Sequence, residues 1–279
     1  MDLSLKASSI REEIIKMILE AGSGHPAGDL GSADFFTIIY FGGLLKHFPK
    51  DPWNENRDRL VLSAGHYCPV LYATLAEAGY FPKEELSTLR KLGTKLQGHP
   101  VARLLPGVEN SSGPLGQGIS VAVGMALAAK IREQKHRVVC FMGDGEQDEG
   151  QVWEAYMSAS KFKLNNLLVV IDRNNIQIDG FTDNVMPTEP LKEKLESFGF
   201  FAVEVDGHSF EEIDNAYRKT EVVHEKPSVV ILRTTPGKGV EFMENDYSWH
   251  GRAPGIGETV QALMEIRKVR TLDGRVDND

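Results

Sequence analysis

The sequence has 279 residues, of which 41% are hydrophobic and 25% charged, and a formal net charge of −9 at pH 7. This length corresponds to about two average domains or one large α/β domain, and the composition excludes disordered, collagenous and coiled-coil chains. The acidic balance argues against nucleic acid as the main partner. The two cysteines, Cys68 and Cys140, exclude a disulfide scaffold and fit a reducing compartment.

The sequence predicts neither a targeting segment nor a membrane-spanning helix. No apolar run approaches the roughly 18 residues that a transmembrane helix requires. The first residues lack a basic region followed by an apolar core, so they do not predict a signal peptide. We therefore expect a soluble, cytoplasmic protein.

The first part of the chain is predicted to be mainly helical. Ile10, Ile14 and Ile18 recur every four residues and indicate one apolar helix face, while the glycines and proline of residues 22–26 force a loop. A nearly all-apolar segment predicts a second, buried helix, and residues 93–118 read as a long glycine- and proline-rich loop. The expected elements here are helices at 4–21, 32–45 and 67–78 and a strand at 59–63.

The second part alternates strands with helices. Residues 137–142 and 166–171 are apolar throughout, which is typical of parallel strands covered on both faces. We expect one α/β domain over residues 1–279, with a mostly parallel sheet and helices on both faces. The remaining expected elements are helices at 117–134, 149–161, 209–219 and 257–268, strands at 201–205 and 229–232, and a frayed tail at about 270–279.

Ligands of such sheets bind beyond the carboxyl ends of the strands, which here are the loops after Met142 and Ile171. The first loop is Gly-Asp-Gly-Glu-Gln-Asp-Glu-Gly over residues 143–150. A helix start with free amides attracts anions, yet Asp144 would repel a phosphate by roughly 4 kcal/mol at 4 Å unless a cation lay between them. Asp144 is thus a candidate metal ligand, although an acidic turn that caps the helix explains this segment equally well.

The second loop begins thirty residues after Asp144 with Asn174, Asn175 and Ile176. Adjacent parallel strands end about 5 Å apart, so Asp144 and Asn174 could share one Mg²⁺, which prefers hard oxygen ligands. This pattern resembles the diphosphate-binding motif of thiamine diphosphate enzymes. The resemblance implies that Asp144, the Asn174 amide and the Ile176 carbonyl bind the metal and that the Gly145 amide contacts the diphosphate.

Histidines next to glycines indicate which family of thiamine diphosphate enzymes the sequence resembles. His47, His136 and His224 lie in ordinary polar segments, and His208 precedes a predicted helix start, which favours a turn role over a catalytic one. The others belong to longer strings that, taken in order over residues 7–267, resemble the N-terminal, diphosphate-binding domain of transketolase. These strings are residues 23–31 around His25, 62–66 ending in His66, 97–100 around His99, the glycine-rich 112–118, and 248–251 around His250.

The resemblance implies a role for each matching position. Transketolases move a two-carbon ketol unit between sugars, with thiamine diphosphate as the electron sink. By this match the protein binds thiamine diphosphate and a divalent cation, and His66 serves mainly the diphosphate. The roles at the remaining positions are substrate binding and proton transfer for His25, His99 and His250, contact with the aminopyrimidine side for Gly113 and Leu115, and a carboxylate pair across a dimer interface for Glu149. Compensation of the helix dipole is the plainer alternative for Glu149.

Whole transketolases have three domains, and this chain resembles only the first. The glutamate that protonates the aminopyrimidine lies in the second, so we expect a partner chain that carries the pyrimidine-binding and C-terminal domains. The expected assembly is a heterotetramer of two chains of each kind, acting on sugar phosphates. Two alternatives stay open from the sequence, namely a non-catalytic scaffold that binds the cofactor and the α subunit of a 2-oxo acid dehydrogenase.

Overall fold

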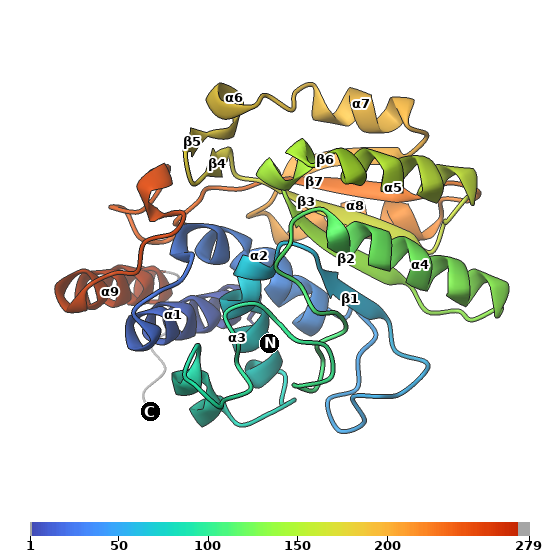
Figure 1. Cartoon of the computed structure of the whole chain (residues 1–279). Coiled ribbons are helices and arrows are strands. Elements are labelled where there is room, and N and C mark those ends of the chain that lie inside the picture. The colour runs from blue at the N-terminus through green and yellow to red at the C-terminus, as the bar shows by residue number, and fades with distance from the viewer. Residues whose placement is uncertain (1, 273–279) are drawn as a thin grey trace.

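A five-stranded sheet forms the centre of the chain in the computed structural model, which describes residues 2–272 (Figure 1). All neighbouring strands of this sheet are parallel, which confirms the predicted α/β architecture. Each strand lies within a residue or two of its predicted position. In spatial order the strands are β1 (Arg59–Leu62), β2 (Val138–Gly143), β3 (Leu167–Arg173), β7 (Ser228–Arg233) and β6 (Phe201–Asp206).

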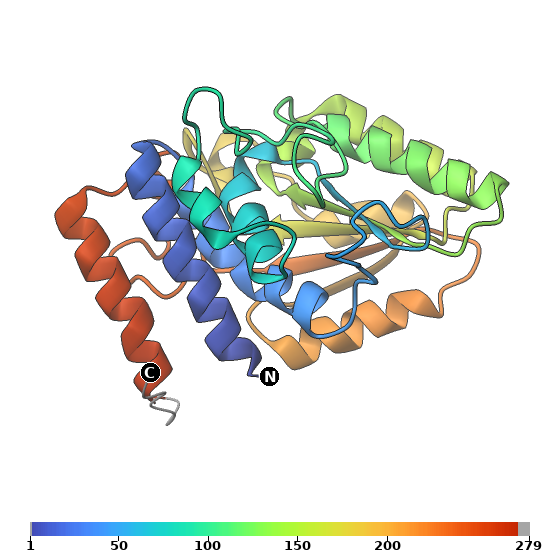
Figure 2. The same ribbon diagram turned by 90° about the horizontal axis from the view of Figure 1, so that it is seen from below.

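Helices cover both faces of this sheet, as the sequence predicted (Figure 2). One face packs against α4 (Gln117–Ile131), α5 (Gly150–Lys161) and α7 (Leu191–Ser197). The other face packs against a thicker helical layer, in which α1 and α9 lie side by side. That layer consists of α1 (Leu3–Ala21), α2 (Pro26–Phe41), α3 (Cys68–Glu77), α8 (Phe210–Glu221) and α9 (Ile256–Leu272).

The two hydrophobic cores share the strands between them. In β2, Val139 and Phe141 pack into the core under α2, whereas Cys140 and Met142 pack into the core under α4 and α5. Successive side chains of a strand point to opposite faces, so both sets are buried and the strand is apolar at every position. This is the physical reason that the uninterrupted apolar runs predicted buried parallel strands correctly.

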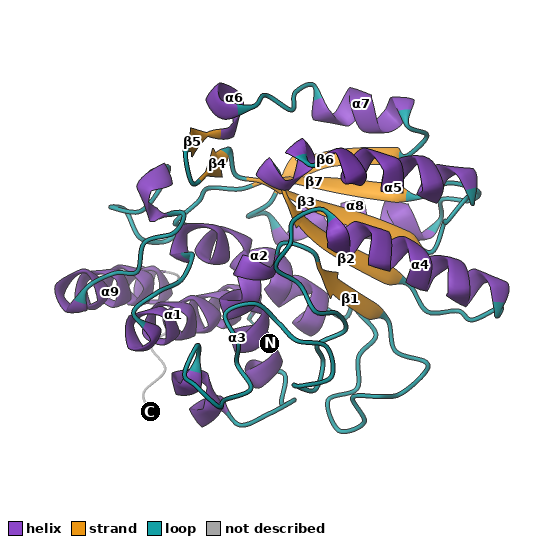
Figure 3. Ribbon diagram, viewed as in Figure 1, coloured by secondary structure: helices purple, strands orange, loops and turns teal. Residues whose placement is uncertain are grey.

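Short elements connect the main ones, and the sequence did not predict them (Figure 3). Segments of two to seven residues are too short to show a hydrophobic period, and α7 was missed for the same reason. These connections are the antiparallel pair β4 (Ile176–Gln177) and β5 (Gly180–Phe181), helix α6 (Thr182–Val185), and the 3₁₀ turns η1 (Gly65–Tyr67), η2 (Lys83–Thr88), η3 (Gly145–Asp148) and η4 (Tyr247–Trp249).

The second helix differs from its predicted position at 32–45, because α2 begins at Pro26 and ends at Phe41. Proline fits the first turn of a helix, where its missing N–H costs nothing. Position 28 lies inside the helix and requires glycine there, because a Cβ would stand 2.8 Å from the ring of Tyr67. The loop predicted at 22–26 is thus present at residues 22–25, and the helix starts directly after His25.

The end of the chain also differs from expectation. Helix α9 continues to Leu272, so residues 270–272 are helical where the sequence predicted fraying, and residues 273–279 of the predicted tail lie outside the described residues. Within residues 2–272, none of the helices is both long enough and apolar enough to span a membrane.

Candidate active site

A cavity of about 320 Å³ lies at the carboxyl edge of the sheet. It collects side chains from segments up to 225 positions apart (His25 to His250), including every histidine that the sequence analysis assigned to the site. We call it the histidine cavity. Its lining includes His25, His66, His99, His250, Asp144 and Ile176.

The loops after β2 and β3 meet at this edge, as predicted from the two motifs. Gly143 is paired with Asp172 in the sheet, and the Asp144 N–H donates to the Asp172 carbonyl at 3.1 Å. The Asp144 carboxylate accepts hydrogen bonds from the N–H groups of Gly145 at 2.8 Å and Asn175 at 2.7 Å. Burial, followed by the nearby Asp172, raises the pKa of Asp144 to about 7. A buried carboxylate thus lies at the cavity wall.

The Asn174 side chain is fixed by a buried hydrogen-bond network. Its Nδ2 donates to the Tyr67 hydroxyl at 2.9 Å and to Asp172 at 2.8 Å, and its Oδ1 accepts from the Ile176 N–H at 3.0 Å. Tyr67 also donates to Asp172 at 2.6 Å. Tyr67 and Asp172 were not predicted as site residues, because a tyrosine or an aspartate alone does not indicate a site in a sequence.

The donors at this edge have the chemistry of a magnesium site. The Asp144 carboxylate and Ile176 both line the cavity, and the Asn174 side-chain oxygen accepts a hydrogen bond from the Ile176 N–H. Within the described residues no group of three or more His, Cys, Asp or Glu side chains is placed to hold a metal. A cation here would therefore depend on one carboxylate together with amide and carbonyl oxygens, a set that suits Mg²⁺.

The imidazole rings form a cluster. The ring centroids of His25 and His66 are 5.0 Å apart, and those of His25 and His250 are 5.6 Å apart. Burial, then the charge of His250, lowers the pKa of His25 to about 3, and burial lowers the pKa of His250 to about 4. Nδ1 of each of these two rings is buried without a hydrogen-bond partner. Neutral imidazoles with unused polar atoms are suited to bind a hydroxylated ligand.

Burial is also the first cause of the lowered pKa of the remaining two site histidines. The pKa of His66 lies well below its ordinary value, and the other site histidines add to the burial effect. His99 is more exposed, and the Arg90 guanidinium adds to the effect of burial there, lowering the pKa of His99. Arg90 donates to the Ser23 hydroxyl at 3.0 Å, and a Cβ on Gly98 would stand 2.9 Å from its Nε. Arg90, which no motif indicated, thus joins the loop of His25 to the loop of His99.

Close glycine contacts hold the glycine-rich loop beside the histidines. A Cβ on Gly65 would stand 2.8 Å from the Gly113 nitrogen, and a Cβ on Gly118 would stand 2.5 Å from the Ser63 Cα. Both contacts are shorter than side chains tolerate, so glycine is required for this approach. They bring Gly113 and Leu115 to the cavity wall.

Two carboxylates of the first loop have different environments. Glu149 is exposed, precedes helix α5 and is absent from the cavity lining. Glu146 is buried at the cavity wall and accepts hydrogen bonds from the Ser63 hydroxyl and from the N–H groups of Gly116 and Gly143. Burial raises the pKa of Glu146 to about 7. Glu146 was not predicted as a site residue, because the sequence of an acidic loop does not show which of its carboxylates is buried at the cavity.

His208 has a structural role, as the sequence favoured. Its Nε2 accepts from the Thr235 N–H at 2.8 Å, so its Nδ1 carries the proton and donates to Asp34 at 2.8 Å. Arg11 binds the same Asp34 carboxylate at 2.6 Å. This buried network connects α1, α2 and the turn before α8 and lies outside the histidine cavity lining.

Comparison with known proteins places this chain in a family. Residues 4–268 match the family described as transketolase, thiamine diphosphate binding domain. The chain is 38% identical over 264 residues to an apulose-4-phosphate transketolase subunit of Phocaeicola vulgatus, covering 95% of this chain and 93% of that protein. It is 42% identical over 267 residues to the 6-deoxy-6-sulfo-D-fructose transketolase subunit SqwG of a Clostridium species, covering 96% and 97%.

Full-length transketolases match over part of their length. The crystal structure of the Campylobacter jejuni enzyme superimposes with a TM-score of 0.90 at 36% identity, covering 96% of this chain but 43% of that one. Human transketolase is 36% identical over 261 residues, which is 93% of this chain and 41% of that protein. These matches favour a transketolase over the scaffold and the dehydrogenase subunit. The chain belongs to the transketolase family, as the thiamine diphosphate-binding N-terminal subunit of an enzyme that transfers ketol groups.

Proposed function

We propose that this chain forms one half of each active site of a split transketolase, and that a partner chain with the pyrimidine-binding and C-terminal domains forms the other half. The observation that carries the proposal is the histidine cavity itself. Four histidines and the Asp144 loop meet at one sheet edge although they come from widely separated segments. Relatives named as transketolase subunits match this chain over nearly their whole length, which supports a partner.

The loops after β2 and β3 are the proposed holder of Mg²⁺ and the diphosphate. Asp144, the Asn174 amide oxygen and the Ile176 carbonyl would ligate the cation, and the Gly145 N–H would donate to the diphosphate. The Asp144 carboxylate is buried and pairs with Arg173 at 3.1 Å. Its position supports this assignment, because a divalent cation there would reverse the local sign for an anionic ligand.

The histidines take the proposed roles of substrate binding and proton transfer. Thiamine diphosphate, when bound, supplies the electron sink of the reaction. His25, His99 and His250 would hydrogen-bond the donor hydroxyls and accept or return protons there, while His66 would bind the diphosphate. Their neutral state and the unpartnered Nδ1 atoms of His25 and His250 support these roles.

The proposed contacts toward the partner lie on the glycine-rich loop and the start of α5. Gly113 and Leu115 would contact the aminopyrimidine side of the cofactor, and the exposed Glu149 would share a proton with a carboxylate of a neighbouring chain. We infer a heterotetramer in which residues 1–279 act as one domain. The free, buried Cys68 and Cys140 support a cytoplasmic location.

Family membership defines the reaction type more closely than it defines the sugar. The two bacterial relatives named above act on a sugar phosphate in one case and a sulfonated sugar in the other. We therefore propose a ketose donor and an aldose acceptor, with a phosphorylated sugar as the first substrate to test.

Reconstitution tests the proposal. The purified chain with thiamine diphosphate and Mg²⁺ should show no ketol transfer, and addition of a partner chain that carries the pyrimidine-binding and C-terminal domains should restore it. The assay follows consumption of the aldose acceptor with a panel of ketose donors. The matched control adds the same partner to an Asp144→Asn chain. Ketol transfer by the lone chain would contradict the half-site proposal.

A further inference from the structure

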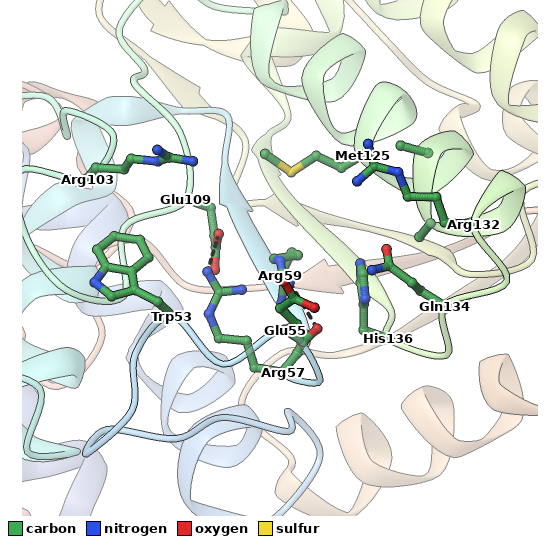
Figure 4. A pocket seen from close by; sticks show the side chains of 12 residues that line it. Trp53, Glu55, Arg57, Arg59, Arg103, Glu109, Met125, Arg132, Gln134 and His136 are labelled. Atoms are coloured by element: carbon green, nitrogen blue, oxygen red, sulfur yellow. Dashed lines mark hydrogen bonds and ion pairs between the residues drawn. The ribbon is translucent and has the colours of Figure 1, made fainter.

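A second and larger cavity, of about 760 Å³, lies at the opposite, amino edge of the sheet (Figure 4). It is an open cavity bordered by the start of β1, the segment before β2, the end of α4 and the long loop before α4. Neither the family match nor the proposed function assigns it a role. We call it the arginine cavity, lined by Trp53, Arg57, Arg59, Arg103, Arg132 and His136 among others.

Positive charge predominates in the arginine cavity, although the whole chain is acidic. Among the side chains that line the cavity, four arginines outnumber two carboxylates, Glu55 and Glu109, by two charges. Asp58, which is outside the lining, also acts on Arg59. Burial, then the charge of Arg57, lowers the pKa of Arg59. Burial, then Arg59, also lowers the pKa of His136, so this ring adds no charge at neutral pH.

The two inner arginines are held rigidly. Arg57 is 6% exposed, pairs with Glu109 at 2.9 Å and donates from Nε to the Pro52 carbonyl at 2.6 Å, yet its Nη1 is buried without a partner. Arg59 donates to backbone carbonyls, including that of Glu55 at 3.2 Å. A buried guanidinium nitrogen without an acceptor is costly, so the site is prepared for an additional acceptor.

The two outer arginines are free to bind a ligand. Arg103 and Arg132 extend toward the pocket from opposite sides (Figure 4). Within the part of the chain that the structure describes, neither side chain has a hydrogen bond or an ion pair. Arg103 also has a φ of 64°, an uncommon conformation for a residue other than glycine.

We propose that the arginine cavity binds a phosphate monoester of a small metabolite. Guanidinium groups match the oxygens of a phosphate with paired hydrogen bonds. The excess of two positive charges matches a phosphate monoester, which carries about −1.5 to −2 at pH 7. The volume lies within the range of about 300–1,000 Å³ typical of small-molecule sites, and Trp53 and Met125 provide apolar walls for a carbon skeleton.

Titration of the full-length chain with inorganic phosphate, glycerol phosphate and uncharged glycerol, at constant ionic strength, tests the proposal. Trp53 is 48% exposed at this cavity and provides a local fluorescence signal, which Trp53→Phe should remove. We expect saturable binding of glycerol phosphate with a dissociation constant on the order of 1 mM or lower, weaker binding of phosphate, and none of glycerol.

Arg103→Gln with Arg132→Gln should weaken binding at least about tenfold, because two charge-assisted contacts are removed. These exposed side chains have no partners among the described residues, so the fold should be unaffected. The matched control is Arg218→Gln, an exposed arginine paired with Asp214 on α8, which should bind normally. Equal binding by the double variant, equal loss in the control, absence of saturable binding, or loss of binding on assembly with the partner chain would each overturn the proposal.

Discussion

The histidine cavity and the arginine cavity lie at opposite edges of the same sheet and have opposite chemistry. At the carboxyl edge, burial leaves neutral imidazoles beside a carboxylate that backbone N–H groups support. At the amino edge, four guanidinium groups outnumber the carboxylates that line the cavity. The first cavity is proposed to hold a cation and its diphosphate beside a hydroxylated substrate, and the second to hold a dianion through side-chain charge alone.

The two cavities also differ in how their residues are arranged along the chain. The histidine cavity is built from contiguous strings in which glycines bring two backbones together, such as Gly65 against Gly113 and Gly118 against Ser63. The arginine cavity is built from single side chains on elements that are ordinary in sequence. A site that needs backbone contact leaves a sequence motif, whereas a site that needs only side-chain charge leaves none. Substitutions at the histidine cavity test this contrast, from the largest expected effect to the smallest.

The largest effect is expected for Asp144→Asn. Removing the only carboxylate proposed as a metal ligand should lower ketol transfer by the assembled enzyme about a thousandfold or more, since a bound cation contributes several kcal/mol. Mg²⁺-dependent binding of thiamine diphosphate, measured by calorimetry, should be lost as well. Asp183→Asn is the matched control, because Asp183 is exposed and also pairs with Arg173, at 2.7 Å. Unchanged cofactor affinity in Asp144→Asn would remove Asp144 from the metal site.

A smaller effect is expected when His25 and His99 are both changed to alanine. Loss of groups that transfer protons should reduce kcat of the assembled enzyme about a hundredfold or more. Cofactor affinity should stay within a few fold, because the Asp144 loop and His66 are untouched. His224→Ala, an exposed histidine outside the cavity lining, is the control. Normal turnover in the double variant would refute the catalytic assignment.

Two glycines of α4 provide a matched pair for stability. Gly118→Ala should lower the free energy of unfolding by about 1–3 kcal/mol, because its Cβ would stand 2.5 Å from the Ser63 backbone. Gly124→Ala should raise it by up to about 1 kcal/mol, because no atom lies within 4 Å of the new Cβ. Urea unfolding followed by circular dichroism measures both. Equal effects would show that the close approach at Gly118 is not required.

The last effect is a slope, expected in the pH dependence of stability. The folded-state pKa values of His25 and His250 are about 3 and about 4, below their ordinary value of 6.5. Below pH 6.5 the unfolded chain therefore binds protons that the folded chain does not, and stability falls as the pH decreases toward 4. Each ring contributes up to about 1.4 kcal/mol per pH unit.

Urea unfolding between pH 6.5 and 4.5 measures this slope. His25→Gln should make the slope shallower than in the unchanged chain, because one of the buried neutral rings is gone. His224→Gln should leave it unchanged, since that residue is exposed. A slope that is the same in His25→Gln would indicate that His25 titrates normally in the folded protein.

Prediction of the fold from sequence succeeded where a long periodic or apolar segment was present. The strands around Phe141 and Val170 were found because both of their faces are buried. The start of α2 was misplaced because the sequence could not distinguish a glycine that breaks a helix from Gly28, which packs against Tyr67. The hairpin at Ile176 was missed because two-residue strands have no period.

The sequence by itself determined the family resemblance, the parallel sheet and the four histidines of the histidine cavity, because glycine-rich strings and apolar strands are local features. The tertiary structure decided which carboxylate of an acidic loop is buried, since Glu146 turns inward and Glu149 outward. It also placed Tyr67 on Asn174 and gathered the arginine cavity from distant segments. Burial and charge proximity depend on the packing of the whole chain, which no local pattern records.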